Sequence, residues 1–177
     1  LWESNISTMG QSFGKPMISK LADGTWAVFV TSGYNNADGV GRAYVLNANT
    51  GAVIQTMTTT GSGLKELNNY VADPAGDNTT TLFYGGDLEG NVWRFQWDFN
   101  SSSFTTKKVV QLQSSGGTVQ PITTRIELVQ GQAGGSLPRI LVATGKLLGV
   151  GDLSSPAQQS IYGFDYTADG YSNAASL

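Results

Sequence analysis

Apolar residues in this chain gather in short runs rich in Val, Ile, Phe, Tyr and Trp. Runs of roughly four to eight such residues, bounded by Gly, Asn, Asp and Ser, predict β-strands. No stretch of the sequence shows the periodicity of an amphipathic helix. The clearest runs cover residues 26–30, 43–46, 52–57, 82–84, 92–97, 108–112, 122–128, 140–144 and 161–166. The pattern therefore predicts an all-β protein.

The runs recur in a fixed order, in which an apolar strand ends at a small residue, a Gly/Asp/Asn loop follows, and the next strand carries an aromatic residue. The glycines of three such steps, Gly33, Gly86 and Gly145, lie 53 and 59 residues apart. This spacing fits one four-stranded propeller blade of roughly 40–50 residues with loop insertions. We expect about three antiparallel blades, over residues 11–60, 61–116 and 117–177 of one domain. A β-sandwich is the alternative, which the even spacing of the glycine–aromatic steps disfavours.

Three blades do not close a ring, because propellers have about four to eight. The chain is therefore expected to be a fragment of a larger ring. The remaining blades would come from the same polypeptide or from a companion chain.

Composition narrows the possible functions. Charged residues make up only 13% of the chain, the net charge is −3, and the ten Lys and Arg residues are scattered. Nucleic-acid binding requires clustered basic residues and is not expected. The sequence contains neither Cys nor His, so thiol chemistry and the commonest general base are absent. Low charge with abundant Ser, Thr, Asn and Gly is typical of an extracellular protein.

Seven motifs in order resemble the C-terminal propeller of the PilY-type (PilC-like) tip proteins of bacterial type IV pili. One motif alone would be a weak signal, but the ordered series spans nearly the whole chain. The matching segments are QSFGKP at 11–16, DGTWAV at 23–28, SGYNN at 32–36, YVLNANTG at 44–51, YGGDLEGNVWRF at 84–95, QPITT at 120–124 and GKLLGVGDL at 145–153.

The resemblance implies a propeller similar in fold to quinoprotein dehydrogenases but without their catalysis, so no pyrroloquinoline quinone is expected. It further implies a role in pilus assembly, adhesion and twitching motility at the pilus tip on the bacterial outer surface. The implied partners are minor pilins and a host or other surface ligand. A secreted carbohydrate-binding propeller and a quinoprotein-like oxidoreductase are the alternatives.

The loop at 73–81 is the candidate metal site. Ca²⁺ takes about six to eight oxygen ligands, and a loop with carboxylates at positions 1, 3 and 5 and a carbonyl at 7 supplies several of them. The PilY-type family has such a calcium loop at this point, which would assign Asp73, Asp77 and the Thr79 carbonyl to positions 1, 5 and 7. Ala75 and Thr81 stand where the family usually has Asp. The loop is therefore either a weak calcium site or a turn with two solvated aspartates.

Other polar and aromatic candidates are expected to be structural. The loop Asn35–Gly39 has the composition of a turn whose side chains satisfy nearby backbone groups. Asp87 and Asp152 follow glycine steps and are expected to accept hydrogen bonds from loop amides. The four tryptophans could stack on sugars, but at strand positions they are expected to fill gaps between blades. They are Trp2, Trp26, Trp93 and Trp97.

Overall fold

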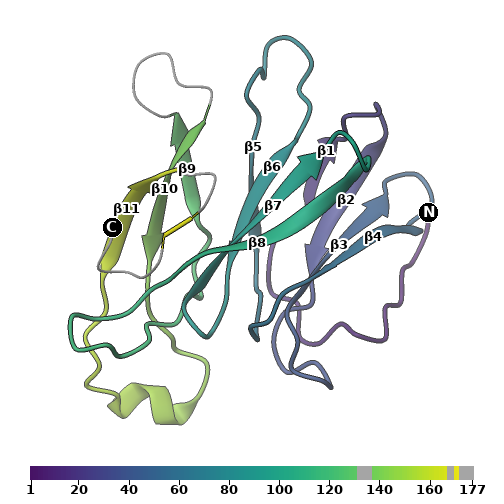
Figure 1. Ribbon diagram of the computed structural model, residues 1–177. Helices are drawn as coiled ribbons and strands as arrows, with labels where there is room; N and C mark the ends of the chain where they lie inside the picture. The colour runs from purple at the N-terminus through teal and green to yellow at the C-terminus, as the bar shows by residue number, and fades with distance from the viewer. Residues whose placement is uncertain (131–136, 167–169, 172–177) are drawn as a thin grey trace.

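Three antiparallel sheets follow one another along the chain and stand side by side (Figure 1). The computed structural model describes residues 1–130, 137–166 and 170–171. The first sheet contains β1 (Met17–Lys20), β2 (Trp26–Thr31), β3 (Arg42–Asn47) and β4 (Val53–Thr58). The second contains β5 (Leu67–Tyr70), β6 (Leu82–Gly86), β7 (Asn91–Asp98) and β8 (Ser103–Gln111). The third contains β9 (Glu127–Gln130), β10 (Pro138–Ala143) and β11 (Ile161–Asp165), and a 3₁₀ helix, η1 (Val150–Ser154), precedes β11.

Within each sheet the strands are neighbours in chain order, as in propeller blades. The prediction of an all-β, partial propeller is confirmed. Two details differ from the sequence-based expectation. In the described part of the chain the third sheet has three strands rather than four, and its first strand is β9 instead of a strand over 122–128. Ile122 forms a single bridge with Gly145, because the chain there crosses from the second blade to the third.

The blades are held together by side chains that alternate between the two faces of the middle sheet. Successive residues of a strand point to opposite faces. Phe83 and Phe95 therefore belong to the core shared with the first blade. Leu82 and Tyr84 belong to the core shared with the third. Every residue of β6 is buried, which explains why this strand reads as a continuous apolar run.

Aromatic rings dominate the contact between the first and second blades. Phe29 of the first blade packs edge-on against Phe83 of the second, with ring centroids 5.0 Å apart, and against Phe104 of the second at 5.9 Å. Within the second blade, Phe104 in turn packs edge-on against Phe83 at 4.8 Å and against Trp97 at 5.0 Å. Edge-to-face pairs of this kind add stabilisation beyond the area that they bury. The two blades therefore share one core.

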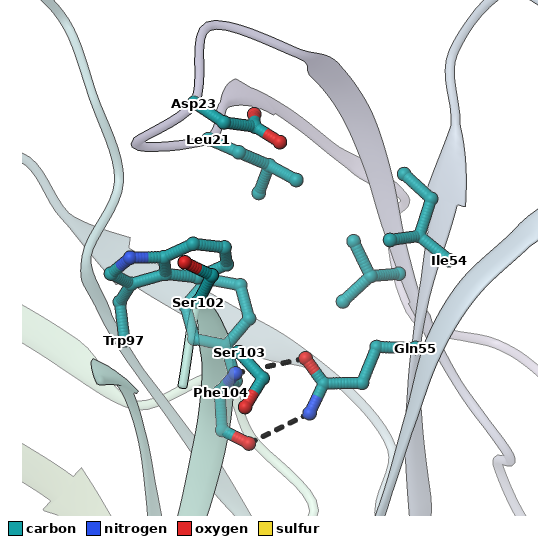
Figure 2. A pocket seen from close by; sticks show the side chains of 9 residues that line it. Leu21, Asp23, Ile54, Gln55, Trp97, Ser102, Ser103 and Phe104 are labelled. Atoms are coloured by element: carbon teal, nitrogen blue, oxygen red, sulfur yellow. Dashed lines mark hydrogen bonds between the residues drawn. The ribbon is translucent and has the colours of Figure 1, made fainter. Parts of the chain in front are cut away.

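One side chain also bridges these blades by hydrogen bonds. The Gln55 amide on β4 donates to the Phe104 carbonyl at 2.7 Å and accepts from the Phe104 N–H at 2.8 Å (Figure 2). These backbone groups face away from β7 on the outer edge of the second sheet. Gln55 thus satisfies an edge that would otherwise be open to pairing with another strand.

We expect Gln55→Ala to lower the free energy of unfolding by about 1–2 kcal/mol, because it leaves two partly buried backbone groups without partners. Urea unfolding followed by tryptophan fluorescence measures the change. Gln159→Ala is the matched control, because the Gln159 amide donates to the carbonyl of nearby Ala157 and bonds to no other residue that the structure describes. Equal effects of the two substitutions would contradict the bridging role.

The connections between strands lie at two opposite ends of the blades. In an antiparallel meander, the link from first to second strand and the link from second to third emerge at opposite ends. Figure 1 shows the β5–β6 loop, with residues 71–81, at the upper end and η1 at the lower end. The candidate calcium loop and the GKLLGVGDL segment are thus at opposite ends of the molecule.

Candidate functional site

The structure brings the predicted metal ligands together in the β5–β6 loop. Asp73, Asp77, Thr79 and Thr81 line one shallow hollow beside Phe99. The Asp73 Oδ1 atom accepts the Gly76 N–H at 2.8 Å, and the Asp77 Oδ1 atom accepts the Thr79 N–H at 2.8 Å. The side chain of each aspartate therefore holds the loop together by accepting a hydrogen bond from a nearby backbone N–H.

This set of donors falls short of what calcium needs. Ca²⁺ sites in proteins supply about six to eight oxygens and gain affinity with each added carboxylate. The hollow offers two carboxylates, and no group of three or more acidic, His or Cys side chains suited to a metal is found among the described residues. The Thr79 N–H lowers the pKa of Asp77, and the positive charge of Lys20 lowers it further. A lysine close enough to act on Asp77 also opposes a bound cation, so the residues do not fit a site of ordinary calcium affinity.

Among the described residues, Asp87 has the most buried acidic side chain, and it accepts most of the hydrogen bonds that hold the β6–β7 turn. Its side chain is fully buried. Oδ1 accepts the backbone N–H groups of Glu89 and Asn91, both at 2.9 Å. Oδ2 accepts the Asn91 side-chain amide at 2.9 Å and the Trp93 Nε1–H at 2.7 Å. Burial raises the pKa of Asp87, although these donors pull it the other way. The expectation that Asp87 bonds loop amides is confirmed.

The other structural expectations are confirmed in part. Asp152 accepts the N–H groups of Leu148 and Gly149 at 2.8 and 3.0 Å. In the turn Asn35–Gly39, the Asn36 amide donates to the Val40 carbonyl at 2.8 Å. The expectation that all four tryptophans fill gaps between blades was wrong for two of them. Trp93 and Trp97 are buried between blades. Trp26, the first residue of the inner strand β2, is 50% exposed, and Trp2 is exposed and donates its Nε1–H to the Ala48 carbonyl.

Loops from all three blades form an apolar hollow at the end of the molecule that carries η1. The hollow has a volume of about 520 Å³ and is lined by residues from the N-terminal segment, the β2–β3 and β6–β7 turns and the β10–β11 loop. Phe13 is 67% exposed and Leu147 is 68% exposed on its walls. Leu88 and Leu148 complete the apolar lining. Exposed apolar surface of this kind is typical of protein interaction sites.

The β10–β11 loop is held in place beside this hollow. Lys146 forms an ion pair with Asp152 at 3.1 Å, and Asp152 in turn binds two backbone amides of the loop. The same contacts hold the pKa of Asp152 below its usual value, with the Leu148 N–H as the largest cause. Leu147 and Leu148 are therefore presented on a fixed loop. The segment lies within one of the sequence motifs, but no pattern in the sequence indicated that Leu147 and Leu148 would be exposed.

Comparison with known proteins identifies the family. The PilY1 β-propeller domain matches residues 4–175, which is nearly the entire chain. The chain belongs to the PilY1 β-propeller family. The resemblance in the sequence motifs is thereby confirmed.

Curated relatives of this family are type IV pilus biogenesis factors. One PilY1 homolog of Xylella fastidiosa is 28% identical over 92% of this chain, and another from the same organism is 30% identical over 92%. PilY1 of Pseudomonas aeruginosa is 33% identical over 54% of the chain. The chain spans only 13% of the length of the two Xylella relatives and 9% of PilY1.

A solved structure supports the same fold. The crystal structure of the Pseudomonas aeruginosa PilY1 C-terminal domain superposes with a TM-score of 0.79 at 25% identity. It covers 96% of this chain, and the match extends over 40% of that domain. A PilY1-type propeller domain thus contains substantially more chain than the three sheets described here. No helix among the described residues is long and apolar enough to cross a membrane.

Proposed function

We propose that this chain is part of the propeller of a type IV pilus biogenesis factor and works through protein–protein contacts rather than catalysis. Membership of the PilY1 family carries the proposal. Its expected place is the bacterial outer surface, at the pilus tip, where it would support pilus assembly, adhesion and twitching motility. The carbohydrate-binding alternative has less support, because two of its four candidate tryptophans, Trp93 and Trp97, are buried, which leaves only Trp2 and Trp26 with ring surface open to solvent.

The apolar hollow beside η1 is the proposed docking surface for a minor pilin. It combines exposed apolar side chains from the N-terminal segment and the β10–β11 loop, namely Phe13, Leu147 and Leu148, with the half-buried Leu88 of the second blade and the buried Tyr34 of the first. Replacing one of the few hot-spot residues near the centre of an interface costs about 2 kcal/mol or more, which is more than tenfold in affinity. An acidic substitution in this surface is therefore expected to weaken binding of a minor pilin.

We expect Leu147→Asp to weaken capture of minor pilins by the full-length protein at least roughly tenfold, and to reduce surface pili and twitching. Phe99→Asp is the matched control. Phe99 is also strongly exposed, but it lies on the β7–β8 hairpin and does not line the hollow beside η1. Capture of pilins by Leu147→Asp at the wild-type level would argue against this docking surface. Equal loss with both variants would indicate a general effect of added charge.

Further blades are the second proposed partner. On the third sheet, Val129, Leu141 and Ile161 lie on the face opposite the shared core and are exposed. Neighbouring blades of a propeller bury such faces against one another. We propose that additional blades, from the same polypeptide or a companion chain, cover this face.

We propose that the loop of Asp73, Asp77 and Thr79 binds calcium only weakly, at millimolar concentrations of the ion. The two carboxylates and the nearby charge of Lys20 support this proposal. Extracellular calcium modules have dissociation constants of about 10⁻⁴–10⁻³ M. Because this loop has only two carboxylates, its dissociation constant for calcium is expected to be higher than that range.

A further inference from the structure

A small pocket opens between the first and second blades (Figure 2), away from the hollow beside η1. It neighbours the hollow of the candidate calcium loop, since residues of the β1–β2 turn and of the β7–β8 hairpin line both. Its volume is about 200 Å³. The β1–β2 turn forms one wall, β3 and β4 form a second, and β7 with the β7–β8 hairpin forms the third. The pocket is too small for a drug-sized ligand, whose sites are typically about 300–1,000 Å³. It is suited to a single side chain.

The interior of the pocket is apolar and preformed. Leu21 and Val45 are almost completely buried in its walls. The two hydrogen bonds between Gln55 and the Phe104 backbone close its floor (Figure 2). Trp97 lies on the side of the hairpin, with its benzene ring toward the centre of the pocket. A hydrocarbon stem inserted here would meet packed side chains rather than a mobile surface.

A carboxylate stands at the mouth of this apolar pocket. Asp23 is exposed, and its Oδ1 atom accepts the Thr25 N–H at 2.8 Å. None of the ion pairs between described residues involves Asp23, and no Lys or Arg is among the described residues that line the pocket. The negative charge of Asp23 is thus available to a ligand.

We propose that this pocket binds the cationic side chain of a lysine or arginine from a partner protein. Such side chains bury a hydrocarbon stem along apolar surface and keep the charged head at its edge. The stem would pack between Leu21 and Ile54, and the head would lie beside the Asp23 carboxylate at the mouth of the pocket. The negative charge of that carboxylate attracts a cation placed next to it. This inference does not rest on the proposed pilin docking.

A sugar is a poorer match for the same walls. Sugar recognition requires an open aromatic face and several free polar groups. Trp97 is only 8% exposed, and both ends of the Gln55 amide are engaged by Phe104. Charge and shape together therefore favour an amphiphilic cation.

Ligand-observed saturation-transfer NMR on the full-length protein tests the proposal, with n-butylammonium and n-butylguanidinium as analogues of the two side chains. n-Butanol is the neutral probe of matched size. We expect both cations to bind saturably in the millimolar range and n-butanol to bind several-fold more weakly. Asp23→Asn should weaken the cations about two- to fivefold, the range of one exposed ion pair. Asparagine retains the acceptor for the Thr25 N–H, so the turn is preserved.

Glu89→Gln is the control, because it removes the same charge from an exposed side chain on the β6–β7 turn, outside the pocket. It should leave cation binding unchanged. Equal binding of n-butanol and n-butylammonium, or unchanged cation affinity in Asp23→Asn, would overturn the proposal. Saturable binding of methyl glucoside that competes with the cations would also overturn it, by marking a sugar pocket.

Discussion

Asp87→Asn is expected to lower the free energy of unfolding by about 3–4 kcal/mol, the range for disrupting a buried polar network. The carboxylate accepts hydrogen bonds from Glu89, Asn91 and Trp93, and all of these donors converge on a fully buried group. Asparagine has one acceptor oxygen and an NH₂ group. Its NH₂ group would face N–H donors, which leaves buried donors unsatisfied.

Denaturant unfolding of wild-type and variant protein, followed by tryptophan fluorescence, measures this loss. Asp98→Asn is the matched control, because Asp98 organises the β7–β8 hairpin in the same way, by accepting the Asn100 N–H at 3.0 Å and the Ser101 hydroxyl at 2.9 Å. Asp98 is more open to solvent, so its replacement should have a several-fold smaller effect. Comparable losses in both variants would mean that burial of Asp87 does not matter.

The pH dependence supplies a second measurement. Burial raises the pKa of Asp87, so the folded protein holds this proton more tightly than the unfolded chain. The contribution of Asp87 to stability therefore falls as the pH rises from the ordinary Asp value near 3.8 through the raised value. Asp38 behaves oppositely. The Arg42 guanidinium holds the pKa of Asp38 at about 2, and its contribution is lost as the pH falls from near 3.8 toward 2.

Restoring the missing carboxylates of the β5–β6 loop is expected to create calcium affinity. In wild-type protein, titration calorimetry should show no saturable binding below about 1 mM, because two carboxylates are too few. The double variant Ala75→Asp/Thr81→Asp should bind at about 10⁻⁴ M or tighter, a gain of at least about tenfold, since calcium affinity rises with ligand charge. Thr81 already lines the same hollow as Asp73 and Asp77.

Two controls separate coordination from simple charge. Adding Asp77→Ala to the double variant should abolish the new binding. Thr118→Asp/Ala157→Asp adds the same charge at exposed positions elsewhere and should leave calcium binding unchanged. Micromolar binding by wild-type protein would show that Asp73, Asp77 and backbone oxygens suffice. Failure of the double variant to bind would show that the loop cannot wrap an ion.

Strands with strong apolar character could be located from the sequence, whereas the first strands of the first two blades could not. β6 and β7 are buried on both faces and give long apolar runs. β1 and β5 are four residues each, and β5 has the sequence LNNY, which carries little β pattern. These strands form because β2 and β6 offer them hydrogen-bonding edges. The positions of β1 and β5 are therefore determined by the neighbouring strands β2 and β6 rather than by the β propensity of their own residues.

The candidate sites divide in the same way. The candidate calcium loop could be identified as a candidate from the sequence, because Asp73, Asp77 and Thr79 are close together in the chain; whether it binds calcium stays a prediction. The pocket of Asp23 and Trp97 could not, because these residues are far apart in the chain and meet only when two blades pack together. The hollow beside η1 likewise requires loops from all three blades.

The all-β class, the repeat of the blades, the family and the turn-forming roles of Asp87 and Asp152 could all be predicted from the chain's amino acids. These features depend on local periodicity and on residues within a few positions of each other. Which aromatic residues are buried, and which apolar side chains remain exposed, depends instead on how the blades pack. Trp26 and Trp97 are both strand tryptophans, yet Trp26 is half exposed, whereas Trp97 is enclosed by Phe104 of the same blade and Leu21 of the first blade. Whether a strand side chain is buried depends on which blade packs against its face of the sheet. That packing joins segments that are far apart in the sequence, so local sequence patterns do not reveal it.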